Sequence, residues 1–201
     1  TEVVKRFREV ISIEELKEWY QKLLDEYHKW LSYQKKWKEE RNHSLQSLEF
    51  PFFYREGQRK MVSSVYHTIG ASRQIFIQAP TGVGKTMSTI FPAVRAVGEG
   101  KGETIFYLTA KTITRTVAQE AFEVLREKGM KYKVVTITAK EKLCFMDETK
   151  CDPVHCPYAR GHFDRVNDAV YELWTTKSRY DRETIREQAE KWQVCPFEMC
   201  L

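Results

Sequence analysis

The sequence predicts an α/β fold: a parallel sheet with crossover helices, joined to a mostly helical, four-cysteine metal-binding insertion and a long N-terminal helix. Three observations support this prediction. Short β-rich runs alternate with helical stretches from residue 50 to residue 139, and strand–helix–strand repetition is typical of a parallel sheet. Four of the five cysteines fall after position 150. A long helical pattern with one apolar face precedes both regions.

Residues 1–49 are expected to form a helical extension or linker. The helix is predicted to begin at Ser12, because Glu15 follows three residues later and the pair forms a capping box. Apolar and aromatic residues then recur at gaps of four and three residues, which places them on one face: Leu16, Tyr20, Leu23, Tyr27, Trp30 and Trp37. We expect this stripe to pack on another helix or on a neighbouring domain.

Three short β-rich runs predict the strands of the sheet. They lie at residues 74–79, 104–109 and 133–138. The two helical stretches between them are predicted to end at Gly98 and Gly129, because glycine accepts the left-handed backbone that commonly closes a helix.

Composition excludes several classes of protein. The 201 residues allow one domain with an insertion or an extension. No apolar stretch is long enough to cross a bilayer and no signal peptide is visible, so we expect a cytoplasmic protein without a membrane partner. The net charge of +5 permits a polyanionic partner without demanding one. Because the sequence starts at Thr1 rather than at methionine, we expect a piece of a longer protein.

A phosphate-binding loop follows the first predicted strand. Its glycines allow successive backbone N–H groups to point at a phosphate, and the next helix adds the positive end of its dipole. Lys85 is expected to bind the β- and γ-phosphates of ATP and Thr86 to bind Mg²⁺, which makes these two the candidate catalytic residues. The nucleotide-binding residues of the loop are Thr81, Gly82, Val83, Gly84, Lys85 and Thr86.

A second nucleotide-binding group precedes the loop. Gln58 carries the paired donor and acceptor that can recognise adenine. Tyr54 and Arg55, just before it, are candidates for contact with the same base. A simple helix start is the alternative interpretation of these residues.

The cysteines predict a metal centre. Thiolates suit an iron–sulfur cluster or zinc, and spacing alone does not choose between them. Paired C-x-x-C knuckles, which are typical of zinc sites, do not occur here, and this favours iron–sulfur. The candidate ligands are Cys144, Cys151, Cys156 and Cys195, and Cys200 is interpreted as a free or buried thiol.

These motifs resemble those of superfamily 2 helicases, and specifically the XPD/DinG-like iron–sulfur helicases. The resemblance is closest to the bacterial DinG-related helicases, at residues 54–59, 79–86 and 106–115. It implies a RecA-like fold, with a partial first motor domain at residues 50–139 and a partial iron–sulfur domain at residues 140–201. It also implies ATP-dependent, 5′-to-3′ unwinding in DNA repair, with ATP, Mg²⁺ and a [4Fe–4S] cluster as cofactors.

The expected partners are single-stranded DNA, or DNA with a single-stranded end, and the rest of the same polypeptide. The resemblance implies a second motor domain and allows an upstream nuclease-like domain. It assigns Thr109, Lys111 and Thr112 to contacts with DNA phosphates. For the two threonines, a strand end and a helix cap are the alternative interpretation. Arg160 and Phe163 belong to a stretch that interleaves basic and aromatic side chains, a composition suited to single-stranded nucleic acid. A solvated loop before a helix capped by Asp164 is the alternative. A second helix of this region is expected to begin behind Asp181.

Hydrolysis needs an acidic pair after an apolar strand, and neither Asp25-Glu26 nor Asp147-Glu148 has that setting. We therefore expect these 201 residues to bind nucleotide without hydrolysing it or unwinding DNA. One alternative function is a nucleotide-binding module whose zinc- or cluster-stabilised lobe serves interaction or redox sensing. Another is a zinc-stabilised nucleic-acid-binding protein with an idle phosphate loop.

Overall fold

The computed structural model of the chain describes residues 8–110 and 112–200, without the side chains of Thr112 and Ile113. The chain divides into two compact units inside its first helix, one ending at Trp37 and the other starting at Lys38. Each unit is described by itself. The expected domain boundaries at 49/50 and 139/140 remain predictions.

Helix α1 spans Ile13–Gln46, close to the predicted helix. The capping box forms: the Ser12 hydroxyl accepts from the Glu15 N–H at 3.2 Å, and the Glu15 carboxylate accepts from the Ser12 N–H at 2.7 Å. The first part of the predicted stripe is exposed, with 46% exposure at Leu16 and 58% at Tyr27. Among the described residues, no helix combines the length and apolar character needed to cross a bilayer.

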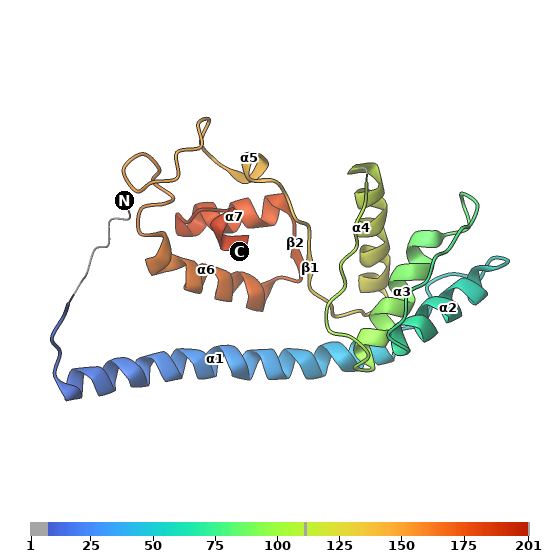
Figure 1. Cartoon of the computed structure of the whole chain (residues 1–201), viewed down its shortest axis with the longest axis horizontal. Coiled ribbons are helices and arrows are strands. Elements are labelled where there is room, and N and C mark those ends of the chain that lie inside the picture. Colours follow the sequence, from blue (N-terminus) through green and yellow to red (C-terminus); the bar gives the residue numbers. More distant parts are fainter. Residues whose placement is uncertain (1–7, 111, 201) are drawn as a thin grey trace. The chain divides into compact units, whose positions relative to one another are not determined.

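Three helices surround the first hydrophobic core: α2 (Gln58–Gly70), α3 (Lys85–Gly98) and α4 (Thr112–Glu127), shown in Figure 1. The predicted stop at Gly129 is confirmed, since the chain turns there with φ 97° after α4. Helix α3 does end at Gly98, but the left-handed glycine that follows it is Gly100, with φ 75°. The largest fully buried side chains of this core come from α1, α3 and α4: Leu45, Ile90, Val94 and Leu125.

The expected sheet is mostly absent from the described residues, which corrects the prediction of three strands. Residues 74–79 and 104–109 form no strand. The third run contributes only β1 (Val134–Val135). A strand needs a hydrogen-bonded neighbour, and the first two runs expose their apolar side chains instead, with Phe76 94% and Phe106 78% exposed.

The second hydrophobic core lies in the cysteine-containing lobe, residues 140–200. It is built by α5 (Lys140–Leu143), α6 (His162–Thr176), β2 (Arg179–Tyr180), α7 (Arg182–Trp192) and the 3₁₀ helix η1 (Glu198–Cys200). Its buried members include Leu143, Leu173, Ile185, Val194 and Met199.

The ends of the two long helices of the lobe test two expectations. The start of α7 is confirmed, because the Asp181 carboxylate accepts from the Thr184 N–H at 3.0 Å. The start of α6 is corrected: the helix begins at His162, after Gly161 with φ 65°, so Asp164 lies in its first turn and is not its cap. The Arg165 side chain occupies this corner, because its guanidinium donates to the carbonyls of Arg160 and Gln193 at 2.8 and 2.7 Å.

A short parallel ladder joins the two cores. Strands β1 and β2 pair with Val134 opposite Arg179 and Val135 opposite Tyr180. Beside the ladder, the Lys133 ammonium donates to the Lys177 carbonyl at 3.1 Å and to the Tyr180 hydroxyl at 3.0 Å. It therefore binds at the C-terminal end of α6, where helix carbonyls have no partner within the helix.

Candidate functional site

The phosphate loop has the backbone that its glycines predict. Gly82 and Gly84 adopt left-handed conformations, with φ of 83° and 76°, and α3 begins directly after them at Lys85. A side chain at either position would be strained, because the left-handed region is costly for residues other than glycine. Glycine at these two positions therefore brings the loop to the N-terminus of α3, where backbone N–H groups have no acceptor within the helix.

Lys85 is exposed and folds back onto this loop. Its ammonium donates to the carbonyls of Ala79 at 2.8 Å and Pro80 at 3.0 Å. A phosphate would offer charged acceptors, which form stronger hydrogen bonds than neutral carbonyls do. Thr86 is half-buried in the first turn of the same helix, Thr81 is exposed and Val83 is half-buried.

The predicted base-reading residues contact the phosphate loop. The Arg55 guanidinium donates to the Gly82 carbonyl. Gln58 is buried, and its side-chain oxygen accepts from the Arg55 N–H at 3.0 Å. Its amide nitrogen lies against the loop, since a Cβ added to Gly84 would be 2.5 Å from it. Two motifs separated in sequence thus meet at one site.

Tyr54 stands in a stack beside this site. Its ring lies parallel to the Phe50 ring, with 4.3 Å between centroids, and the Arg59 guanidinium lies 5.3 Å from its centroid. A cavity of about 400 Å³ between α2 and α3 includes Tyr54 in its lining. That lining contains no residue of the phosphate loop, so we do not assign the cavity to the phosphates.

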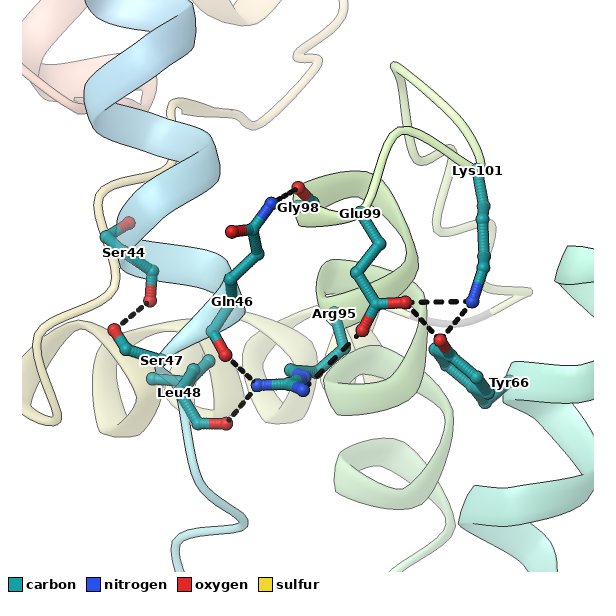
Figure 2. Close-up of polar contacts among 9 residues, drawn as sticks. All are labelled: Ser44, Gln46, Ser47, Leu48, Tyr66, Arg95, Gly98, Glu99 and Lys101. Atoms are coloured by element: carbon teal, nitrogen blue, oxygen red, sulfur yellow. Dashed lines mark hydrogen bonds and ion pairs between the residues drawn. The ribbon is translucent and has the colours of Figure 1, made fainter.

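The C-terminal end of α3 is anchored by polar contacts (Figure 2). Arg95 donates to the Gln46 carbonyl and, at 3.2 Å, to the Leu48 carbonyl, while the Gln46 amide donates to the Gly98 carbonyl at 2.7 Å. The ends of α1 and α3 therefore cap each other. This fixes the helix whose opposite end carries the phosphate loop.

Glu99 extends the anchor. Its carboxylate accepts from the Lys101 ammonium at 2.8 Å and from the Tyr66 hydroxyl, and it lies 3.5 Å from the Arg95 guanidinium. The hydrogen bond from Lys101, followed by that from Tyr66, lowers the pKa of Glu99.

The four candidate ligands lie in different settings of the cysteine-containing lobe. Cys144 ends α5 and is half-buried, as is Cys195, whereas Cys156 is buried and Cys151 exposed. Hydrogen bonding with Cys151 raises the pKa of Lys140, and charge interactions with Cys151, Glu198 and Cys195 add to the effect. Two of the thiols therefore lie near one ammonium.

Metal coordination by these cysteines remains a prediction. Within residues 8–110 and 112–200, no group of three or more His, Cys, Asp or Glu side chains is placed to hold a metal ion. The backbone of Cys195 has a fixed partner, because its N–H donates to the His162 imidazole at 3.2 Å. Burial lowers the pKa of His162, which favours the neutral imidazole that this contact requires.

The proposed DNA-binding residues are only partly described. Thr109 is exposed, Lys111 lies outside the described residues, and the Thr112 side chain is not described. Arg160 is exposed and donates to the Pro153 carbonyl at 3.0 Å. Phe163 is 85% exposed, so its ring is accessible for stacking.

Sequence reasoning missed two side chains that hold the cysteine segments, His162 and Arg186. Arg186 donates to the Leu143 and Cys144 carbonyls at 2.8 and 2.9 Å. No local pattern marks either residue, because each acts on a segment more than thirty positions away.

Comparison with known proteins shows a family match. The family model of the DEAD/DEAH box helicase domain matches residues 55–158, a stretch that includes Arg55, Gln58, the phosphate loop and three of the candidate cysteine ligands. No curated protein and no solved structure matches the chain. The matched stretch covers more than half of the 201 residues.

Proposed function

The chain belongs to the DEAD/DEAH box helicase family, and from this premise we propose that it is the nucleotide-binding part of an ATP-dependent DNA helicase. The family implies a P-loop fold of the RecA type and a nucleotide-binding enzyme. The observation that carries the proposal is the joint site at the start of α3. There Gly82 and Gly84 turn the loop, and Arg55 and Gln58 contact it from α2 and the segment before it.

ATP would be bound at this site by its phosphates and by its base. The loop N–H groups and the N-terminus of α3 attract the phosphates. Lys85 would exchange the Ala79 and Pro80 carbonyls for phosphate oxygens, and Thr86 would hold Mg²⁺. Mg²⁺, when bound, neutralises phosphate charge during transfer.

The base would be recognised by Gln58, with Arg55 and Tyr54 beside it. Because Gln58 is buried and already bonded to Arg55 N–H, its amide is held in one orientation. A fixed donor and acceptor pair discriminates between bases, since the wrong base does not present the matching acceptor and donor.

The cysteine-containing lobe is proposed to hold a [4Fe–4S] cluster through Cys144, Cys151, Cys156 and Cys195. The donor set fits this group, because four thiols are its usual ligands. Lys140 lies near two of these cysteines, since hydrogen bonding with Cys151 and charge interaction with Cys195 raise the pKa of Lys140. When bound, the cluster would tie together segments far apart in sequence and stiffen the lobe.

DNA binding is proposed for Thr109, Lys111 and Thr112 in the first core region and for Arg160 and Phe163 in the lobe. The exposure of Thr109, Arg160 and Phe163 supports this assignment. We also propose 5′-to-3′ polarity, a DinG-like subfamily and cooperation with a second motor domain, following the resemblance of the motifs. With these assignments the proposed partner is single-stranded DNA. ATP hydrolysis is proposed to require the complete enzyme, including the second motor domain.

A titration with fluorescent ATP and GTP analogues tests the nucleotide site. Lys85→Ala should weaken binding of both analogues by about tenfold or more, because it removes charge-assisted hydrogen bonds. Gln58→Ala should weaken ATP binding more than GTP binding, and Lys60→Ala, an exposed neighbour on α2, should change neither. Equal affinity in the wild type and Lys85→Ala would refute the site.

Metal analysis tests the lobe separately. Protein purified without oxygen should contain about four irons per chain, lost on substitution of any proposed ligand but not of Cys200. Zinc in colourless protein that resists iron reconstitution would instead favour the zinc-stabilised interaction module. DNA-stimulated ATP turnover by these residues alone would contradict our expectation that they bind without hydrolysis.

A further inference from the structure

One arginine of the lobe holds the backbone of a candidate ligand. Arg186, in the second turn of α7, donates from Nη1 to the carbonyls of Leu143 at 2.8 Å and Cys144 at 2.9 Å. These carbonyls lie at the C-terminal end of α5, where helix carbonyls have no partner within the helix. One guanidinium therefore caps α5 at the residue that carries the thiol.

The same guanidinium also contacts the aromatic ring of the next residue, Phe145. It lies 4.3 Å from the centroid of Phe145, a distance typical of a cation–π contact. The Phe145 ring in turn lies 4.5 Å from the Tyr158 ring, two residues beyond Cys156. Arg186 thus links the segment of Cys144 directly, and that of Cys156 through two rings.

The helix that presents Arg186 is itself fixed. Asp181 caps its start, and Ile185 and Ala189 are 3% and 0% exposed in the second core. Leu143, on the segment that Arg186 binds, is 1% exposed in the same core. Both ends of the contact are therefore anchored. Cys151 is exposed on the intervening loop.

We propose that Arg186 is the positioning residue of Cys144. Its two hydrogen bonds and its ring contact involve backbone and aromatic atoms rather than sulfur, so they orient the Cys144 segment whether or not a metal is bound. The benefit to a metal centre rests on the proposed function: a fixed segment loses less conformational entropy when its thiolate coordinates. The positioning itself is testable without that premise.

Alkylation of the metal-free chain measures the positioning. Protein treated with a chelator is labelled with iodoacetamide, and mass spectrometry gives the rate at each cysteine. In Arg186→Met the rate at Cys144 should rise by roughly tenfold relative to Cys151, since labelling of a held segment follows the population that opens. Faster labelling at Cys144 therefore reports lost positioning of its segment.

Two further variants make the result specific. Lys191→Met, on the same helix, breaks the Lys191–Glu172 ion pair without touching the Cys144 segment, so its Cys144 to Cys151 ratio should match the wild type. Arg186→Lys keeps the charge but loses the planar fork, and should raise the ratio by a smaller factor. If Arg186→Met loses its helical circular dichroism signal, it has unfolded, and the labelling ratio of Arg186→Lys then tests the proposal.

Iron and sulfide reconstitution separates this proposal from the metal proposal. A wild type that takes up iron, with faster iron loss in Arg186→Lys, would support both. A wild type without iron, but with the expected labelling ratios, would overturn the metal centre and leave the positioning role intact. Unchanged labelling at Cys144 in both Arg186 variants would overturn the positioning role.

Discussion

Replacing Gly98 by alanine has two opposing effects on stability: alanine has the higher helix propensity, but its added Cβ would crowd α1. The residue ends α3 where it meets the C-terminal turn of α1 (Figure 2). A Cβ added there would lie 2.5 Å from the Leu45 Cβ and 3.2 Å from the Leu45 carbonyl carbon and the Gln46 nitrogen. Two of these three atoms are backbone, and Leu45 is 0% exposed, so the neighbours cannot move away cheaply.

The magnitudes decide the sign of the change. Alanine would gain up to about 1 kcal/mol from helix propensity, and less at a helix end. Overpacking of a close contact costs about 1–3 kcal/mol. A weakened hydrogen bond from Gln46 to the Gly98 carbonyl would add about 1 kcal/mol to the cost. We therefore expect Gly98→Ala to lower the free energy of unfolding by about 1–2 kcal/mol or more.

Urea titration followed by far-ultraviolet circular dichroism measures the change. Gly70→Ala is the matched control, because a Cβ at the end of α2 would meet the Lys101 side chain at an ordinary 3.5 Å. That variant should be as stable as the wild type or slightly more stable. A Gly98→Ala protein as stable as the Gly70→Ala protein would refute the close-approach argument.

Two pH predictions follow from shifted pKa values. Burial lowers the pKa of Lys133 from 10.5 to about 8, so the folded chain binds fewer protons than the unfolded chain between these values. The unfolding free energy of the wild type minus that of Lys133→Met, both measured in urea, should therefore rise from pH 8 to pH 10.5. A difference that falls over this range would contradict the prediction. Lys191, followed by Trp192 and Gln188, lowers the pKa of Glu172 from 4.5 to about 2. The stabilisation is then present above pH 4.5 and lost towards pH 2, and thermal melts of Glu172→Gln should lack this acid-dependent loss.

Local signals in the sequence predicted the helix ends well. The capping box at Ser12, the turn at Gly129 and the cap at Asp181 all involve residues within one turn of the contact they make. The start of α6 was misplaced because Asp164 is a good cap by type. The corner is occupied instead by Arg165, whose partners include Gln193 on a distant segment.

The predicted strands show the limit of pattern reasoning. Residues 74–79 have strand-like composition, yet composition does not supply the neighbouring chain that a ladder requires. The only ladder among the described residues pairs β1 with β2, and no sequence pattern marks residues 179–180 as its second strand. Strand pairing is a long-range property, so it emerges only from the packed chain.

Sequence patterns alone predicted a glycine turn directly before a helix at Gly82 and Gly84, because a left-handed backbone and a helix start are local properties. They also marked the cysteines by residue type. The burial of Gln58 against the loop and the contact of Arg186 with the Cys144 segment appear only in the folded chain. Those contacts join positions far apart in the chain, and such contacts are selected by packing rather than by neighbouring residues.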